Sequence, residues 1–308
     1  MAQVEQRPGM SGPQGSAWGT VRDYIAITKP RIIELLLVTA IPSMILAARG
    51  WPEPITAIAV IVGGMLAAGG ANAYNSVYDR DIDALMSRTH ARPVATGAVS
   101  VRGGLTLATL LSAASVLVLS VFANPLSAVL AGIAIVFYAV GYTMLLKRRT
   151  SQNIVWGGAA GCMPVLIAWA AVTGGLSWTP VVLFLIVFWW TPPHYWPLSL
   201  RYRDDYAAAG VPMLPVVTDV RSVTRSIVVY SWIMVATSLV LIPVASMGWV
   251  DSVAAGVLGA VFLVEAHLLR RRALADPQDA RPMRLFHWSI TYLALLFLAV
   301  AIDPFIGS

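Results

Sequence analysis

Nine apolar stretches, each about as long as a membrane-spanning helix, dominate this sequence. Their approximate cores are residues 32–48, 55–73, 105–123, 126–146, 154–172, 180–200, 226–246, 250–269 and 285–302. A helix needs about 20 mostly apolar residues to cross the hydrocarbon core of a bilayer. Charged residues make up only 12% of the chain, whereas a soluble protein carries about 25%. We therefore expect an all-α, polytopic membrane protein with nine transmembrane helices.

Positive charges fall almost entirely on one side of these stretches. If the chain crosses the membrane nine times, 20 of its 21 Lys and Arg residues lie on the side of the N-terminus, and only Arg49 lies on the other. Cytoplasmic loops carry the excess of Lys and Arg in membrane proteins. We therefore expect an integral protein of the inner or plasma membrane, with a cytoplasmic N-terminus and an external C-terminus. Since topology explains the net charge of +6, we expect no nucleic-acid partner.

The N-terminal segment differs in composition from the rest of the chain. Residues 1–20 are rich in Gly, Pro, Ser and Gln, which is typical of disorder, and they lack the charged and then apolar pattern of a signal peptide. We expect a disordered tail over residues 1–21 and one transmembrane domain over residues 22–308. The single cysteine, Cys162, excludes an intrachain disulfide.

A polar motif follows the second apolar stretch. Asn75, Asp79 and Asp83 are spaced four residues apart, so on a helix their side chains share one face. Two carboxylates one turn apart repel each other, and a nearby membrane raises that cost. Mg²⁺ prefers oxygen ligands and often binds through one or two carboxylates together with substrate phosphates. The motif therefore predicts a Mg²⁺–diphosphate site at the mouth of a membrane protein.

Two arginines, Arg88 and Arg92, come shortly after this motif. Guanidinium groups pair well with phosphate oxygens, so we interpret both as diphosphate ligands. The alternative is that they are ordinary cytoplasmic-side cations. We interpret His90, which lies between them, as a surface residue.

A second polar cluster follows the sixth apolar stretch. Pro192 and Pro193 interrupt that stretch near its end, and the backbone carbonyls freed by such a break must be buried in protein or line a cavity. His194 follows the break and is a candidate functional residue, because ionisable groups inside a membrane usually serve function. The alternative is a histidine that is hydrogen-bonded to a freed carbonyl.

The loop beyond this break is acidic. Asp204 and Asp205 have the oxygen ligands for a second metal position. They can equally form solvent-exposed pairs with Arg201 and Arg203. Both interpretations stay open.

Together these motifs resemble the UbiA superfamily of intramembrane prenyltransferases. The resemblance covers residues 22–303 and rests on residues 23–31, 75–89, 92–93, 191–196 and 205–215. The strings Thr191-Pro-Pro-His and Ala209-Gly-Val-Pro-Met-Leu-Pro separate the haem-farnesylating branch from the quinone-prenylating relatives. The resemblance implies helices around a central cavity that opens to the cytoplasmic side.

The reaction that the resemblance implies joins the farnesyl group of farnesyl diphosphate to the 2-vinyl group of haem B, giving haem O. Mg²⁺ is the implied cofactor, and haem is a substrate. His194 is interpreted as an axial haem ligand, because histidine is the commonest such residue. The implied partners are the lipid bilayer and a haem A synthase or terminal-oxidase assembly protein. The implied catalytic and metal-binding residues are Asn75, Asp79, Asp83 and Asp205, and the implied substrate-binding residues are Lys29, Arg31, Arg88, Arg92, His194, Asp204 and Tyr206.

One position departs from the superfamily pattern. Many members carry Asp-x-x-x-Asp in the second motif, but here Arg201 stands four residues before Asp205. A second Mg²⁺ would therefore rest on Asp205, together with Asp204. The sequence is compatible with one Mg²⁺ or with two.

Two other functions are compatible with the sequence. A prenyltransferase that acts on a quinone precursor or another aromatic acceptor would carry the same acidic motifs. A cation-coupled secondary transporter would share the many spans and broken helices. Its acidic residues would lie near the middle of the membrane, whereas Asp79, Asp83 and Asp205 follow the ends of their apolar stretches.

Overall fold

The computed structural model describes residues 17–306, except for the side chains of residues 17, 31, 32, 34, 35 and 278. Every regular element in this part of the chain is a helix, which confirms the all-α prediction. The long helices are α2 (Pro30–Ala48), α3 (Pro54–Tyr78), α5 (Val101–Phe122), α6 (Pro125–Val136) continued by η1 (Phe137–Leu146), α7 (Asn153–Thr173), α8 (Trp178–Arg201), α11 (Val220–Ala245), α12 (Trp249–Ala275) and α13 (Pro282–Ile306). The short ones are α1 (Ala17–Ile27), α4 (Arg80–Leu85), α9 (Arg203–Ala208), α10 (Leu214–Val217) and η2 (Pro277–Asp279).

Each of the nine apolar stretches coincides with one long helix. Within residues 17–306, seven helices are long and apolar enough to cross a membrane: α3, α5, α6 with η1, α7, α11, α12 and α13. The other two are α2, which has a shorter apolar part at Leu36–Ala48, and α8, which contains three prolines. The helices thus have the lengths and apolar composition of a multi-pass membrane protein, while the count of nine spans and the orientation of the termini stay predictions.

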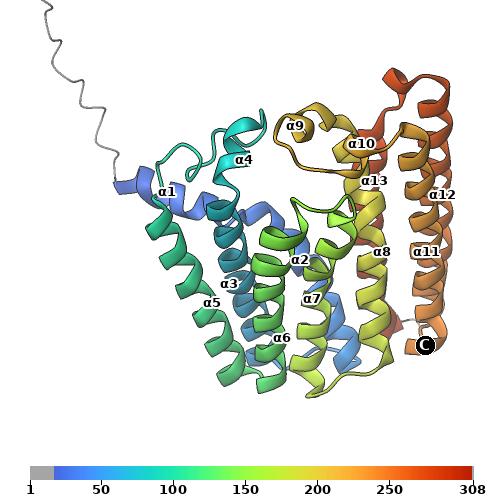
Figure 1. Ribbon diagram of the computed structural model, residues 1–308. Coiled ribbons are helices and arrows are strands. Elements are labelled where there is room, and N and C mark those ends of the chain that lie inside the picture. Colours follow the sequence, from blue (N-terminus) through green and yellow to red (C-terminus); the bar gives the residue numbers. More distant parts are fainter. Residues whose placement is uncertain (1–16, 307–308) are drawn as a thin grey trace, which may run out of the picture.

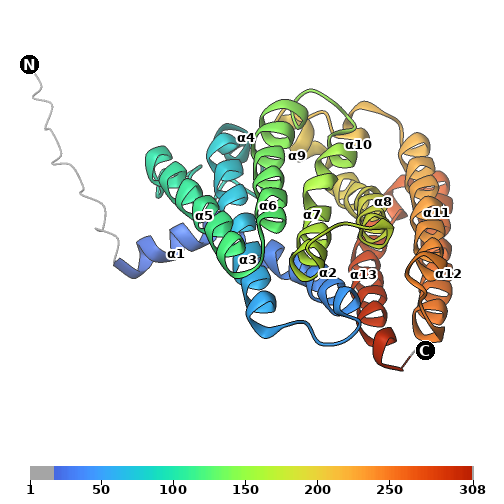
Figure 2. The same ribbon diagram turned by 90° about the horizontal axis from the view of Figure 1, so that it is seen from below.

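The long helices stand side by side and close into a ring (Figures 1 and 2). Consecutive long helices pack against each other, and α13 returns to pack on both α2 and α8. The short helices α4, α9 and α10 lie together at one end of the bundle (Figure 1). Because α3 leads into α4 and α8 leads into α9, both acidic motifs reach that end.

The first helix, α1, runs across the direction of the long helices (Figure 1). It includes residues 17–21, which the sequence places in the disordered tail; residues 1–16 lie outside the described part of the chain. Its Ile27 is buried, whereas Trp18, Val21 and Ile25 are exposed. Such an exposed apolar face is compatible with contact with lipid.

Close contact between α3 and α5 holds the helix that carries the first motif. A Cβ atom at Gly70 would lie 2.5 Å from Ser112 Oγ, and one at Gly63 would lie 2.7 Å from Leu119 Cγ. Small residues allow this close approach of helices in membranes. Ser115 Oγ also donates a hydrogen bond of 2.7 Å to Gly63 O. Gly63 and Gly70 of the second apolar stretch therefore serve packing.

A π-helical segment ends the fourth span. The sequence predicts one uniform helix over residues 126–146, but the last ten residues form η1. Thr143 Oγ1 donates a hydrogen bond of 2.8 Å to Tyr138 O, five residues earlier. Tyr142 packs against Gly157 of α7, where a Cβ atom would lie only 2.2 Å from Tyr142 Cδ2. π-helical turns often occur at functional sites. The π-helical form of η1 therefore makes the region between η1 and α3 a candidate functional site.

Candidate active site

The three polar residues of the first motif meet where α3 passes into α4. The backbone stays nearly helical across the junction, with hydrogen bonds from Asp79 N to Asn75 O (2.9 Å) and from Asp83 N to Asp79 O (2.8 Å). Asn75, Asp79 and Asp83 are each at most 3% exposed. Asn75 Nδ2 donates to Asp79 Oδ2 at 2.7 Å. The spacing of four residues thus places these side chains on one inward face, as the sequence predicts.

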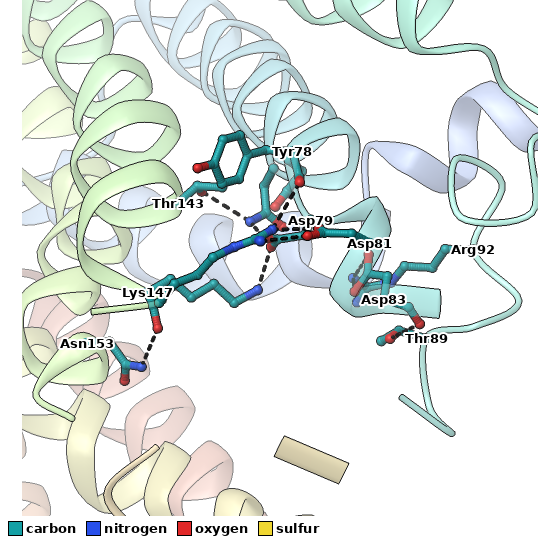
Figure 3. A network of polar contacts seen from close by, with 12 residues as sticks. Tyr78, Asp79, Asp81, Asp83, Thr89, Arg92, Thr143, Lys147 and Asn153 are labelled. Atoms are coloured by element: carbon teal, nitrogen blue, oxygen red, sulfur yellow. Dashed lines mark hydrogen bonds and ion pairs between the residues drawn. The ribbon is translucent and has the colours of Figure 1, made fainter. Parts of the chain in front are cut away.

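Cations from three other segments contact these residues, and Figure 3 shows two of them, Lys147 beside Asp79 and Arg92 beside Asp83. The ammonium group of Lys147, which follows η1, forms an ion pair with Asp79. Arg92 Nη1 donates to both carboxylate oxygens of Asp83 at 2.8 Å. Lys29 Nζ donates to Asn75 Oδ1 at 2.6 Å. Buried carboxylates are stable only when they are paired and hydrogen-bonded, and these contacts supply the pairing.

The backbone conformation of Lys29 is unusual. Lys29 precedes α2 and has φ +53°, a left-handed conformation that costs a residue with a side chain about 1–2 kcal/mol. Burial lowers the pKa of Lys29 to about 7, and the nearby cations Arg92 and Lys147 act in the same direction. Strained backbone often accompanies function, and here it accompanies the contact between Lys29 and Asn75.

Arg148 connects the same end of η1 to the next acidic residue. Its guanidinium donates two hydrogen bonds of 2.7 Å to Asp81, and these lower the pKa of Asp81 to about 2. Arg148 Nη2 also lies 3.6 Å from Asp79 Oδ1. Asn153 of α7 fixes the backbone beside it by donating to Lys147 O at 3.0 Å (Figure 3).

The donor set fits a divalent metal that is shared with a phosphate ligand. Asp79 Oδ1 is buried and accepts no hydrogen bond. No group of three or more His, Cys, Asp and Glu residues that could hold a metal occurs in the described chain. The carboxylates of Asp79 and Asp83 and the amide oxygen of Asn75 would become metal ligands by giving up their present partners Lys147, Arg92 and Lys29. Mg²⁺ commonly binds to so few protein groups when phosphate completes its coordination.

The second acidic segment meets the loop that follows the first. Ser87 Oγ donates to Asp205 Oδ2 at 2.6 Å, across 118 residues of sequence. Arg88 Nη2 donates to the hydroxyl of Tyr206 at 3.2 Å, and that hydroxyl lies 2.8 Å from the hydroxyl of Tyr195. Burial raises the pKa of Tyr206, so its phenol is neutral. Asp205 and Tyr206 therefore belong to the same end of the bundle as the first motif.

Arg88, Asp204 and His90 lie at the edge of this arrangement. The guanidinium of Arg88 lies over the ring of Tyr202, 5.5 Å from its centroid. Asp204 and His90 are exposed, and His90 Nδ1 lies 2.8 Å from Ser87 O. The side chain of Arg31 lies outside the described residues. His90 is thus a surface residue, as predicted.

His194 lies on the side of α8 that faces α13. Its ring stacks between Trp190 (centroids 4.1 Å apart) and Phe286 (4.7 Å). Its Nδ1 lies 2.7 Å from Ser289 Oγ. The hydrogen-bond partner of His194 is thus the hydroxyl of Ser289 on α13. It is not a backbone carbonyl freed by the proline break, which was the alternative interpretation of this histidine.

An apolar cavity of about 800 Å³, a volume that includes the space at its open side, lies between α2, α3, α6, η1 and α7. Its lining includes Leu37 and Ala40 of α2, Gly64 and Asn72 of α3, and Tyr138 of η1. Asn72 is three residues before Asn75 on α3, so the cavity lining ends within about one helical turn of the charged residues. From Val60 to Asn72, α3 lines it over about 18 Å at a rise of 1.5 Å per residue.

A family model described as the UbiA prenyltransferase family matches residues 36–290. The chain belongs to this family. It is 55% identical to the protoheme IX farnesyltransferase of Streptomyces avermitilis over 93% of this chain and 94% of that protein. Its fold resembles that of a digeranylgeranylglyceryl phosphate synthase, with a TM-score of 0.75, 15% identity and coverage of 92% of this chain and 98% of that one.

A UbiA homologue from Archaeoglobus fulgidus bound to GPP and Mg²⁺ has the same fold, with a TM-score of 0.62, 16% identity and coverage of 90% of this chain and 99% of that one. The chain is therefore an integral membrane prenyltransferase of the UbiA family, and the secondary-transporter alternative is wrong.

The acidic motif and the cavity beside it contain residues that the sequence alone does not single out. Lys147 and Arg148 are predicted only as cytoplasmic-side cations, yet both approach Asp79. Asn72 and Tyr138 line the cavity, and their side chains approach to 3.5 Å. The sequence does contain one indication of the contact between Lys147 and Asp79. Lys147 directly follows an apolar stretch and is predicted on the same side of the membrane as Asp79.

Proposed function

We propose that this chain transfers the farnesyl group of farnesyl diphosphate to the 2-vinyl group of haem B, giving haem O. The observation that carries the proposal is the short distance along α3 between an apolar cavity and a cluster of charged residues: Asn72 lines the cavity, Asn75 follows three residues later on the same helix, and Asp79 caps the end of that helix. The acceptor is inferred from the 55% identity to a protoheme IX farnesyltransferase over nearly the whole chain.

The charged face is the diphosphate end of this site. Asn75, Asp79 and Asp83 would hold Mg²⁺, which supplies neutralisation of the charge that develops on the leaving diphosphate. The bound GPP and Mg²⁺ of the A. fulgidus homologue support this assignment. Lys29, Arg92 and Lys147, which contact these three residues, would then contact phosphate oxygens. We assign Asp205 to the same site because it accepts a hydrogen bond from Ser87, which lies in the loop after the first motif.

The apolar cavity is the farnesyl end. When the bond between the allylic carbon and the diphosphate oxygen breaks, the farnesyl cation must survive until the vinyl carbon of haem attacks it. Apolar walls exclude water from such a reaction, and apart from Asn72 and Tyr138 the cavity lining is almost entirely apolar. Water then adds to the resulting haem-side cation and loses a proton, which leaves the hydroxyl group of haem O.

The haem end is assigned to α8 and α13. We propose that His194 binds the haem iron through Nε2, because Nδ1 already contacts Ser289 and aromatic rings hold both faces of the imidazole. Arg88 and Tyr206, at the same end of the bundle, would contact substrate groups at the rim. Asp204 and Arg31 stay proposed rim residues on the strength of the sequence motif.

Topology and partners complete the proposal. The site end of the bundle faces the cytoplasm, with the N-terminus inside and the C-terminus outside, because nearly all cations of the sequence belong to that side. Residues 22–308 would form one transmembrane domain. A haem A synthase or a terminal-oxidase assembly protein would receive the product, since free haem O is poorly soluble in water.

The acceptor is tested by direct competition. Purified protein in lipid nanodiscs receives farnesyl diphosphate and Mg²⁺ together with equal amounts of haem B and 4-hydroxybenzoate, which represents the quinone precursors. We expect mass spectrometry to detect farnesylated haem and no farnesylated benzoate. The reverse product pattern would assign the chain to an aromatic acceptor.

A further inference from the structure

Two aromatic rings stack on the imidazole of His194 and fix the orientation of its plane. The ring of Trp190, one helical turn earlier on α8, stacks at a centroid distance of 4.1 Å with an interplanar angle of 13°. On the opposite side Phe286 of α13 stacks at 4.7 Å and 22°. Stacking of this kind fixes the ring plane but leaves the two nitrogen atoms at the ring edge free to form directional contacts.

Ser289 of α13 fixes the proton of this imidazole. Ser289 Oγ donates a hydrogen bond of 2.6 Å to Phe286 O. A serine hydroxyl has one proton, so at its second contact, 2.7 Å from His194 Nδ1, the oxygen accepts and the nitrogen donates. Ser289 is 0% exposed, which keeps water from competing for either contact.

The same serine also orients the stacking partner. Trp190 Nε1 donates to Ser289 O at 2.8 Å, and this contact is buried. One residue of α13 therefore holds the edge of the imidazole through its hydroxyl and the edge of the indole through its carbonyl. The two rings from α8 cannot rotate independently while Ser289 keeps both contacts.

The proton count has a chemical consequence. A neutral imidazole carries one N–H, and with that proton on Nδ1 the lone pair is on Nε2. Within the described chain His194 Nε2 has no hydrogen-bond partner, and His194 is partly exposed. Metal-binding histidines characteristically donate their other N–H to a neighbouring acceptor, which fixes the tautomer and makes the ligand more basic.

We propose that Ser289 is a positioning residue that holds His194 in the tautomer whose Nε2 binds haem iron. This inference rests on the proposed function, because it takes haem as the ligand. The hydroxyl of Ser289 acts only through His194: Ser289 does not line the farnesyl cavity and makes no contact with the residues of the first acidic motif. Its effect on haem must therefore disappear when the imidazole is absent.

The test compares wild type, Ser289→Ala, His194→Ala and the double variant, each in nanodiscs. Haem B is titrated against each protein by absorbance, and farnesyl diphosphate binding on the same preparations checks folding. We expect Ser289→Ala to weaken haem binding on the order of 10–100-fold, as changes to residues that hydrogen-bond to metal ligands do, and to shift the haem spectrum toward that of His194→Ala. The double variant should equal His194→Ala.

Two further variants separate positioning from packing. Ser289→Thr keeps a hydroxyl and should retain the wild-type haem spectrum. Ser238→Ala is the matched control: Ser238 is a buried serine of α11 that contacts the Tyr292 hydroxyl of α13 at 2.9 Å. It should leave the haem spectrum unchanged, since it makes no contact with His194.

The outcomes distinguish this inference from the proposed function. Additive losses in the double variant, or a wild-type haem spectrum in Ser289→Ala, would overturn the positioning role even if the enzyme makes haem O. A coupled loss with no haem O formed by wild type would support the ligation and overturn the transfer reaction. Unchanged haem spectra in both His194→Ala and Ser289→Ala would overturn the iron contact itself.

Discussion

Arg92 Nη1 donates to both carboxylate oxygens of Asp83 at 2.8 Å, so a cation from the loop after α4 closes over the end of the first acidic motif. Lys147 makes the corresponding contact with Asp79 from the end of η1. These two cations neutralise the carboxylates that a diphosphate substrate would approach with Mg²⁺. We interpret them as groups that exchange a carboxylate partner for phosphate when the substrate binds.

The two carboxylates should be indispensable for the reaction. We expect Asp79→Ala and Asp83→Ala each to lower the turnover of farnesyl diphosphate by about 100-fold or more, the scale of losing a group that stabilises transition-state charge. Substitution by Asn should leave little or no activity. Initial rates at saturating Mg²⁺ measure the effect.

Asp81 provides the control for these variants. It lies between the two carboxylates in sequence, but its side chain is 59% exposed and its partner is Arg148. Asp81→Ala should therefore keep most of the activity. Near-normal turnover in both Asp79→Ala and Asp83→Ala would contradict the metal-site assignment.

Lys147 should act on the diphosphate. We expect Lys147→Gln to raise the KM for farnesyl diphosphate by about 10-fold or more, because a hydrogen bond to a charged group contributes about 1.5–3 kcal/mol. Arg149→Gln removes a charge two residues away on an exposed side chain and should leave KM unchanged. An equal rise in KM for both substitutions would mean that the diphosphate responds only to the overall positive charge of this segment and not to a direct contact with Lys147.

The cavity should set the length of the prenyl chain. Gly64 lines it, and a Cβ atom at Gly64 would meet nothing within 4 Å, so a large side chain fits there only by filling the cavity. We expect Gly64→Phe to lower kcat/KM for farnesyl diphosphate at least about 10-fold relative to geranyl diphosphate, since pocket volume discriminates by a few kcal/mol. Competition between the two diphosphates measures the ratio.

Gly132 of α6 is the matched control for this substitution. A Cβ atom there also meets nothing within 4 Å, but Gly132 does not line the cavity. Gly132→Phe should leave chain-length preference unchanged. If Gly64→Phe kept the wild-type preference, the farnesyl chain would have to bind elsewhere.

Much of this architecture could be predicted because it depends on local rules. The length of each apolar stretch sets one helix, and a spacing of four residues places Asn75, Asp79 and Asp83 on one face. Both features survive in the structure, and so does the meeting of the two acidic segments at one end of the bundle.

The unpredicted parts depend on contacts between distant segments. The ion pair of Lys147 with Asp79 spans 68 residues and requires η1 to lie against α3. The π-helical form of η1 has no signature in an apolar stretch. The cavity is formed where small residues such as Gly64 face one another across helices, and their mutual positions depend on packing that periodicity alone does not define.

Membrane orientation can be checked independently of activity. We expect a reporter fused after residue 86 or 208 to read as cytoplasmic and one fused after residue 175 or at the C-terminus to read as external, because the cations of the sequence concentrate on the first side. A cytoplasmic signal from the C-terminal fusion would show that the number of spans is not nine.

The most direct measurement of the central claim uses wild type and Asp79→Ala side by side. Each protein is incubated with haem B, farnesyl diphosphate and Mg²⁺, and the mass of the extracted haem is determined by mass spectrometry. A parallel wild-type sample contains a chelator that removes Mg²⁺. We predict that only wild type with Mg²⁺ yields haem B increased by one farnesyl group and one hydroxyl group. No such product from wild type, or equal product from Asp79→Ala, would contradict farnesyl transfer at the acidic motif where α3 passes into α4.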